Sequence, residues 1–481
     1  MQPIPPVSGE LNDENIRALF KDAGDFCTRS LVPADLTVYA YFIDGLVSGG
    51  EIAEYVMKPL FENLHDGTPE QLLARARHGA VYSAVADACP DLRTAADKLV
   101  NGFCVVLFPG AGAVAYEVKT GEKRSPSAPE TENTAKGPKD AFTETVRTNT
   151  SLVRRHLRTP SLRFYETSVG RRSGTNVSLA YVDGLTDPDL VARMKTRLSE
   201  LDIDGFTSPA AVEEYVTGAR KTAFPLLQFT ERTDKFVNGL LAGRVGLLVD
   251  GLPAGWLAPV DLGYLMETAE DRGTNYVTAS VLRVLRYAAL LLTMLLPGLY
   301  AAMATFHQQM LPTKLLLAII ESKQNVPFPT VLEVLGLLVA FELLQEAGMT
   351  LPQSVSQSIS VIGGLVIGTA AVEAKLISPA ALIAVSGAGI CGFVLPGKEL
   401  SDAVRVWRLA LTAAAGLAGL YGLTLGSLVL LIHLSGLESF GIAYLAPFSS
   451  LRSGRAILRP RLIAEKFRDR SLHPQDDKNQ A

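Results

Sequence analysis

Three glutamates stand inside an apolar stretch of this sequence, where charged side chains are unusual. The stretch VPFPTVLEVLGLLVAFELLQEAG covers residues 326–348 and contains Glu333, Glu342 and Glu346. A carboxylate at the centre of a membrane helix costs roughly 2.5–3.5 kcal/mol on insertion scales. A helix turns by about 100° per residue, so Glu342 and Glu346 share one helical face and Glu333 lies nearly opposite. The three carboxylates therefore cannot all face one lumen from a single regular helix.

Two arrangements of this helix are compatible with its glutamates. Its apolar part has about sixteen residues, slightly short for a straight crossing of a core that is about 30 Å thick. It could be a short span with carboxylates at its ends and against neighbouring helices, or it could lie in the interface with Glu342 and Glu346 toward water. In a symmetric oligomer each glutamate becomes a ring that favours cations. Glu342 is therefore either part of a cation path or a buried hydrogen-bond anchor between helices.

Small residues crowd the next apolar run. Gly363, Gly364, Gly368 and Thr369 lie within residues 355–372. Gly364 and Gly368 form a small-xxx-small pair, which lets two membrane helices approach closely. We expect this helix to be a tight-packing element, and the alternative is that it also borders a narrow conduit in an oligomer.

Motifs for catalysis are missing. The segment GAGICG (387–392) matches the dinucleotide pattern GxGxxG, but it lies in an apolar run with no preceding strand and no later acidic partner. The sequence has no P-loop, HExxH or GxSxG motif, and its four cysteines and six histidines are scattered. We therefore expect no enzyme activity, no cofactor and no metal site.

The chain divides by composition into a polar half and an apolar half. Long uncharged runs begin at Tyr287, and the last thirty residues are polar and basic. A net charge of −4 argues against nucleic-acid binding, which usually needs a basic face. We predict an α+β cytoplasmic N-terminal region of two related α/β subdomains, followed by an α-helical transmembrane bundle. The predicted segments are an N-terminal extension (1–30), subdomain 1 (31–120), a linker (121–140), subdomain 2 (141–280), a transmembrane domain of four to six spans (281–450) and a basic cytoplasmic tail (451–481).

The polar half contains a duplication. Residues 38–60 resemble residues 177–198, and each stretch is an alternating β-rich run that ends at Asp-Gly-Leu before a helical pattern. Residues 98–118 resemble residues 235–260, and each is a short helix followed by two strands around a turn. Asp44 and Asp183 are expected to be turn residues. The connector between the copies is rich in Pro, Ser, Thr, Lys and Glu, so we expect it to be flexible.

Four uncharged runs are long enough to span a membrane, and they cover residues 287–306, 355–372, 377–396 and 409–432. The N-terminus lacks the features of a secretory signal, and eight Lys and Arg residues from Leu451 onward favour a cytoplasmic C-terminus. Two cytoplasmic ends require an even number of spans. Four spans fit if the glutamate helix is interfacial or re-entrant, and six fit if it spans and 438–450 also crosses.

Several stretches resemble the A subunit of the GerA family of spore germination receptors. Together they cover nearly everything from residue 137 to 450 in the family's order. They are GPKDAFTE (137–144), VNGLLAGRVGLLVDGLP (237–253), HQQMLPTKLLLAI (307–319), VPFP (326–329), FELLQEAG (341–348), GGLVIGTAAV (363–372) and HLSGLESFGIAYLAPF (433–448).

The resemblance implies a subunit of the inner membrane of the dormant spore, which oligomerises into a nutrient-gated ion channel and triggers germination. The implied partners are further copies of the chain, a transporter-like B subunit, a lipoprotein C subunit and membrane lipid. Pro327 and Pro329 belong to the same family motifs as the three glutamates, so all five residues are candidate gating or structural elements. Two alternatives are a non-conducting scaffold or signalling subunit, and the related subunit encoded with dipicolinic-acid channel proteins. A secondary transporter is less favoured, because no inverted repeat is found.

Overall fold

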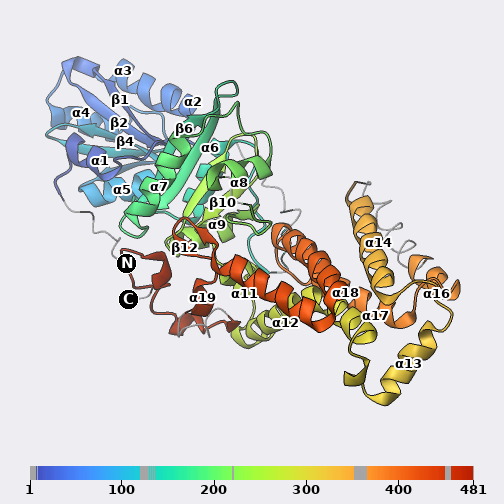
Figure 1. The fold of residues 1–481 in the computed structure, drawn as a ribbon. Helices are drawn as coiled ribbons and strands as arrows, with labels where there is room; N and C mark the ends of the chain where they lie inside the picture. The colour runs from blue at the N-terminus through green and yellow to red at the C-terminus, as the bar shows by residue number, and fades with distance from the viewer. Residues whose placement is uncertain are drawn as a thin grey trace. The chain divides into compact units, whose positions relative to one another are not determined.

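The computed structural model (Figure 1) forms two compact units. Unit 1 comprises Met1–Arg220, Leu227–Pro259 and Leu462–Ala481, and unit 2 comprises Lys221–Leu226 and Val260–Arg461. The residues that the structure describes are 7, 9–119, 129, 132, 134, 136–218, 221–350, 366–449 and 457–479.

Unit 1 begins with a five-stranded sheet in the order β1-β2-β4-β5-β3, in which every neighbouring pair is antiparallel. Its strands are β1 (Phe26–Leu31), β2 (Val38–Ile43), β3 (Ala86–Cys89), β4 (Phe103–Phe108) and β5 (Gly112–Glu117). The helices of this subdomain are α1 (Asp13–Leu19), α2 (Gly49–Glu51), the π-helix η2 (Ile52–Met57), α3 (Lys58–Asn63), α4 (Pro69–Arg77) and α5 (Leu92–Val100).

A second sheet repeats this topology in the order β6-β7-β9-β10-β8, again with antiparallel pairs. Its strands are β6 (Leu162–Val169), β7 (Thr175–Val182), β8 (Gln228–Thr230), β9 (Val245–Val249) and β10 (Gly255–Ala258). Its helices are α6 (Val146–His156), α7 (Pro188–Ser199), α8 (Pro209–Thr217) and α9 (Thr233–Leu241). The shared strand order confirms the predicted pair of related α/β subdomains, and it adds the strands β1, β3, β6 and β8, which the sequence analysis did not predict.

Strand β4 shows why the first sheet is covered on both faces. Its sequence FCVVLF is buried throughout. Side chains alternate between the two faces of a strand, so Cys104 and Val106 join a core that includes residues of α3 and α4. Val105 and Leu107 join the core on the opposite face, which includes residues of α1 and α5. The subdomain is therefore a three-layer structure with helices on both faces of its sheet.

The predicted Asp-Gly turns adopt the left-handed backbone that favours glycine. The φ angles are +89° at Gly45, +75° at Gly184 and +85° at Gly251. The first two follow Asp44 and Asp183, as the predicted turn chemistry requires.

Unit 2 is mainly helical. Its main helices are α12 (Tyr276–Thr305), α13 (Thr313–Lys323), α14 (Thr330–Thr350), α17 (Pro379–Phe393) and α18 (Lys398–Ser435). Shorter elements are α10 (Leu262–Leu265), α11 (Glu270–Gly273), η3 (Gln308–Met310), η4 (Val366–Ala370), α16 (Ala371–Glu373) and α19 (Ala446–Ser449). By length and composition, α12 and α18 are the helices of the described chain that could cross a membrane, and α17 is a shorter apolar helix.

Helix directions in unit 2 follow from paired contacts, and α12 packs against both α17 and α18 (Figure 1). Gly387 of α17 lies opposite Leu296 of α12, and Gly392 lies opposite Thr293, so α17 and α12 are antiparallel. A backbone amide beside the start of α17 binds a carboxylate in the first turn of α14. The ring of Phe341, later in α14, packs against Phe393 at the end of α17. Helix α14 is therefore parallel to α17.

Helix α18 is not the single span that was predicted over residues 409–432. Its backbone breaks at Ala418 and Gly419, where φ is −135° and +61°. The rings of Trp407 and His433 lie only 5.7 Å apart, whereas a straight helix would separate these residues by about 39 Å. The two halves therefore form an antiparallel hairpin, because glycine at position 419 accepts a φ that other residues rarely adopt.

The alternative in which residues 438–450 form a further span is wrong. Over the described part of this segment, β11 (Glu438–Ser439) pairs with β12 (Ile442–Ala443), and the short helix α19 follows. Neither element is long enough to cross a membrane.

The C-terminal segment returns to unit 1. It contains the short helices η5 (Leu462–Ala464) and η6 (Arg470–Leu472). The amide of Gln475 donates to the carbonyl of Leu185 at 2.8 Å, and Nε of Arg468 donates to the carbonyl of Leu241 at 3.0 Å. The tail is thus bound to the second subdomain.

Candidate functional site

Buried arginines join the two subdomains of unit 1. Arg154 of α6 binds both carboxylate oxygens of Asp25, and one of these contacts, from Nη2 to Oδ1, is 2.7 Å long. Both side chains are about 1% exposed. Arg163 of β6 also donates to the carbonyl of Leu19 at 2.9 Å. A buried charge is tolerated only with a partner of opposite charge, so these contacts fix how the second subdomain meets the first.

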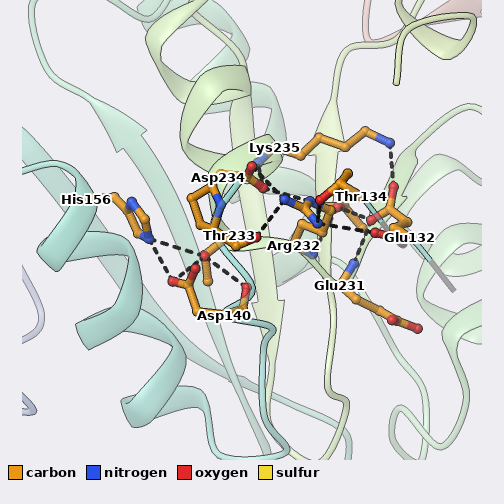
Figure 2. Close-up of polar contacts among 11 residues, drawn as sticks. Glu132, Thr134, Asp140, His156, Glu231, Arg232, Thr233, Asp234 and Lys235 are labelled. Carbon is orange, nitrogen blue, oxygen red and sulfur yellow. Dashed lines mark hydrogen bonds and ion pairs between the residues drawn. The ribbon is translucent and has the colours of Figure 1, made fainter. Parts of the chain in front are cut away.

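Arg232 forms a second buried site, at the start of α9 (Figure 2). Its Nη1 donates to the carbonyl of Glu132 at 3.2 Å and to Oγ1 of Thr134 at 2.9 Å. Its Nη2 donates to the carbonyl of Pro138 at 2.9 Å and to Oδ2 of Asp234 at 2.8 Å, and its Nε donates to Oδ1 of Asp234 at 2.9 Å. We refer to these five residues as the Arg232 cluster.

A guanidinium carries five N–H groups. In Arg232 each of these groups has an acceptor within the protein. The guanidinium of Arg232 has no donor left for an anionic ligand, so we interpret the cluster as a structural site. It holds the C-terminal end of the connector between the subdomains. The prediction that the whole connector is flexible is therefore wrong for this end, because its carbonyls serve as acceptors for a buried cation.

His156 and Asp140 form a hydrogen-bonded pair next to the Arg232 cluster (Figure 2). Nε2 of His156 lies 2.7 Å from Oδ2 of Asp140, which also accepts from Oγ1 of Thr233 at 2.7 Å. The hydrogen bond from His156 is the main cause that lowers the pKa of Asp140 to about 2, although burial opposes it. The same bond raises the pKa of His156 above its ordinary value.

Glu333 lies in the first turn of α14 and is 3% exposed. Its Oε1 accepts a hydrogen bond from the backbone amide of Ser378, the N-cap of α17. Nζ of Lys323 lies 3.9 Å from Oε2. A carboxylate at a helix N-terminus is favoured by the helix dipole and by the free amides there. These contacts explain why a glutamate is kept among apolar residues.

Glu342 faces a different neighbour, as its position on the opposite side of α14 predicted. Its Oε1 accepts from Nη2 of Arg408, which is 1% exposed, and its Oε2 lies 3.8 Å from Nε of Arg405. Both arginines belong to the first half of α18. Glu342 is half-buried and Glu346 is exposed.

The other sequence candidates are placed as follows. Gly363 and Gly364 lie outside the described residues. Gly368 is buried, but an added Cβ would lie 3.6 Å from Leu382, which is ordinary contact, and Thr369 is exposed. Pro327 and Pro329 are exposed in the loop before α14, where the carbonyl of Pro329 accepts from the amide of Glu333 at 3.0 Å. Those of them that lie in the described part of the chain are not brought together into one site.

The family of the chain follows from comparison with known proteins. A family model described as "Bacillus/Clostridium GerA spore germination protein" matches residues 14–471. The chain belongs to the GerA family. The resemblance noted in the sequence is thereby confirmed.

Two relatives of this GerA-family chain come from Bacillus subtilis (strain 168). "Uncharacterized membrane protein YfkQ" is 33% identical over 93% of this chain and 88% of its own length. "Spore germination protein KA" is 34% identical over 90% of this chain and 80% of its own length. A crystal structure of the N-terminal domain of the A subunit of the Bacillus megaterium spore germinant receptor GerK3 is 26% identical over 53% of this chain and 97% of its own, with a TM-score of 0.41.

Two kinds of residue were missed in the sequence analysis of this GerA-family member. Arg408, the partner of Glu342, directly precedes an apolar run, and an arginine at such a place is a signal for a carboxylate partner. Glycines that permit close helix contacts also lie elsewhere than predicted. An added Cβ would lie 2.3 Å from Val331 at Gly416 and 2.8 Å from Leu411 at Gly426.

Proposed function

We propose that this chain is the membrane-embedded A subunit of a spore germinant receptor and that copies of it assemble into an ion-conducting channel opened by a nutrient. The observation that carries the proposal is the GerA-family match over residues 14–471. A relative that is 37% identical over 74% of this chain is named "Spore germination protein A1". The proposed partners are a B subunit, a lipoprotein C subunit and membrane lipid.

The proposed topology has both ends of the chain on the cytoplasmic side of the spore's inner membrane. The contacts of Gln475 with Leu185 and of Arg468 with Leu241 support this, because they tie the tail to the N-terminal region. A chain that leaves and returns to one side crosses an even number of times. In the proposed arrangement α12, α14, the predicted run 355–372 and α17 give four crossings, and the α18 hairpin enters the membrane and returns to the side from which it came.

We further propose that Glu333 and Glu342 are structural anchors within this bundle. Glu333 binds the start of α17, and Glu342 binds Arg408 of α18. An ion pair at membrane depth satisfies two charges at once, so the carboxylate of Glu342 is not available for a passing cation. Pro327 and Pro329 precede α14 and are proposed as the gating or structural turn that leads into it.

Spores that lack this chain test the receptor role. They should lose nutrient-triggered potassium release, and the wild-type gene should restore it. If such spores respond to every nutrient at the parental rate, the receptor role is wrong. Purified protein in potassium-loaded vesicles tests the channel role separately, because a scaffold subunit would restore germination in spores but show no conductance in vesicles.

Glu342→Gln tests the anchor role. The change leaves the buried Arg408 without a charged partner, which costs about 3–5 kcal/mol, so the amount of protein in the membrane should fall severalfold. Glu346→Gln is the matched control on the same helix and should leave the amount unchanged. Normal abundance of Glu342→Gln with reduced potassium release would instead place Glu342 in the conduction path.

A further inference from the structure

Three aromatic side chains are exposed on the first subdomain of unit 1. Tyr55 is 48% exposed, Phe61 is 64% exposed and Tyr82 is 63% exposed. Single exposed apolar residues are normal on a protein surface, whereas a continuous exposed patch often marks a place where another molecule binds. We call these three residues the aromatic patch.

Two members of the patch lie on the helical segment that runs from α2 through η2 to α3 (Figure 1). The inner side of this segment belongs to a core on one face of the first sheet, through Ile52, Val56 and Leu60. On the outer side, Tyr55, Lys58 and Phe61 are exposed. Residues three apart are neighbours on a helix surface, so Lys58 lies between the two rings in one stripe.

Tyr82 lies beside this stripe, although it follows α4 in the sequence. Its amide donates to the carbonyl of Tyr55 at 3.2 Å. Nδ2 of Asn63, at the end of α3, donates to the carbonyl of Ala80 at 2.8 Å. The loop that carries Tyr82 is thus held against the helical segment at two points, and the members of the aromatic patch form one surface.

Carboxylates lie around the aromatic patch. Residues 49–63 contain three glutamates and one lysine, so the segment is acidic. Nζ of Lys58 donates to Oε1 of Glu54 at 3.2 Å. That hydrogen bond is the main cause that raises the pKa of Lys58, and Glu62 and Tyr82 add to the effect. The charge of the lysine is therefore balanced by Glu54, and Glu62 adds an exposed negative charge.

The negative charge decides which kind of partner fits this surface. An anionic membrane surface attracts basic segments rather than acidic ones, and nucleic acid binds basic faces. A second copy of the chain that used the same surface would bring the glutamates of both copies together, because a two-fold contact pairs a surface with itself. A positively charged segment of another protein meets neither obstacle.

We propose that the aromatic patch, with Glu54 and Glu62 beside it, binds an arginine-containing basic segment of another protein. A guanidinium stacks on aromatic faces and pairs with a carboxylate through two hydrogen bonds, and this surface offers both kinds of group side by side. Glu54 and Tyr55 lie in the π-helix η2, and such helices are rare and frequent at functional sites. The proposal does not depend on the chain being a channel, since it uses only the surface of the first subdomain.

Titration of the full-length protein in detergent with labelled peptides tests the site. The peptides alternate serine with arginine, with lysine or with glutamate, and fluorescence anisotropy measures their binding. The arginine peptide should bind most tightly. The lysine peptide should bind severalfold more weakly, because an ammonium group lacks the planar fork of a guanidinium, and the glutamate peptide should not bind. If the lysine or the glutamate peptide binds as tightly as the arginine peptide, the proposal is wrong.

Substitutions in the patch locate the binding site. Phe61→Ala and Tyr82→Ala should each weaken binding of the arginine peptide by about fivefold or more. Both side chains are exposed, so neither change should lower the thermal midpoint of the protein. Tyr215→Ala is the matched control, because Tyr215 is an exposed tyrosine on α8 of the second subdomain, and it should leave the affinity unchanged. Unchanged affinity in the two patch variants, or an equal loss in the control, would refute the proposed site.

Hydrogen–deuterium exchange distinguishes the proposed partner from a second copy of the chain. Addition of the arginine peptide should slow exchange at residues 53–62, because a bound segment shields their amides from solvent. If exchange there slows instead when the concentration of the protein alone is raised, a second copy covers the patch and the proposal is wrong. Slower exchange that the peptide causes only elsewhere in the chain would also overturn it.

Discussion

Arg154 and Asp25 illustrate how single residues hold unit 1 together. The pair is buried and joins α6 of the second subdomain to the turn before β1 of the first. Removing one partner of a buried pair strands the other charge in a medium of low polarity. The contribution of the pair therefore appears mainly as the penalty for breaking it.

Arg154→Met should reduce the free energy of unfolding of unit 1 by about 3–5 kcal/mol, measured by hydrogen exchange at β7 as a function of urea in the full-length protein. Arg171→Met is the control. Its pair with Asp202 is 71% and 62% exposed, and such surface pairs contribute at most about 1 kcal/mol. Similar losses for the two variants would contradict the assignment.

The pair of His156 and Asp140 should make the stability of unit 1 depend on pH. The pKa of His156 is raised, so the stabilisation from the pair is complete below the ordinary histidine pKa and is lost as the pH rises through the raised value. The pKa of Asp140 is lowered to about 2, so its contribution is present above the ordinary aspartate pKa and is lost only as the pH falls toward 2. The pair is thus strongest between about pH 4 and pH 6.5.

His156→Gln should lower the thermal midpoint of the full-length protein by about 2 °C at pH 5.5 and by less at pH 9, because the wild type has lost its ion pair by then. His65→Gln, at an exposed position of the first subdomain, should have the same small effect at both pH values. If His156→Gln lowers the thermal midpoint equally at pH 5.5 and pH 9, the pair adds no pH-dependent stability.

At the scale of elements, α18 depends on glycine in two ways. Gly419 takes the positive φ that reverses the chain, and Gly416 and Gly426 let neighbouring side chains reach the backbone. Close approach of this kind is how helices associate in membranes. The tight packing that was expected around Gly368 is found here on the hairpin.

Gly416→Ala places a methyl group 2.3 Å from Cγ1 of Val331 on α14. A β-branched side chain is stiff, so overpacking should destabilise the helical unit by about 1–3 kcal/mol. The thermal midpoint in detergent should fall accordingly. Gly336→Ala is the matched control on α14, since nothing lies within 4 Å of its added Cβ. Equal midpoints for the two variants would argue against the close contact of α14 and α18.

At the scale of the whole molecule, the chain leaves unit 1 before α12 and returns to it after residue 461. The bound tail therefore limits how the intervening helices can cross a membrane. Labelling with an impermeant maleimide checks this in vesicles of known orientation, after the partly exposed Cys27 and Cys391 have been replaced by serine.

Cysteines introduced at Ser199 and Ser471 should both be labelled from the cytoplasmic side. A cysteine at Gln309, which lies just beyond the end of α12 in η3, should be labelled from the other side, because the proposed topology places one crossing between it and unit 1. Labelling of the first two positions from opposite sides would contradict the even number of crossings.

The sequence by itself determined the features that depend on local patterns. Alternation of apolar residues, Asp-Gly turns and the repeated order of elements predicted two related subdomains, because the two-residue period of a strand and the positive φ of a turn are written in neighbouring residues. The length of the apolar runs likewise marked the helical half. The motifs from residue 137 to 450 indicated the GerA family.

Only the tertiary structure decided the partners of the charges and the course of α18. Glu333 meets the amide of Ser378, and Glu342 meets Arg408. These partners lie dozens of residues away, and no local period encodes which distant group satisfies a carboxylate. The reversal of the chain at Gly419 is likewise not encoded in the local sequence. Glycine permits a positive φ at any position, and whether the chain adopts it depends on the packing of the two halves of the hairpin against each other.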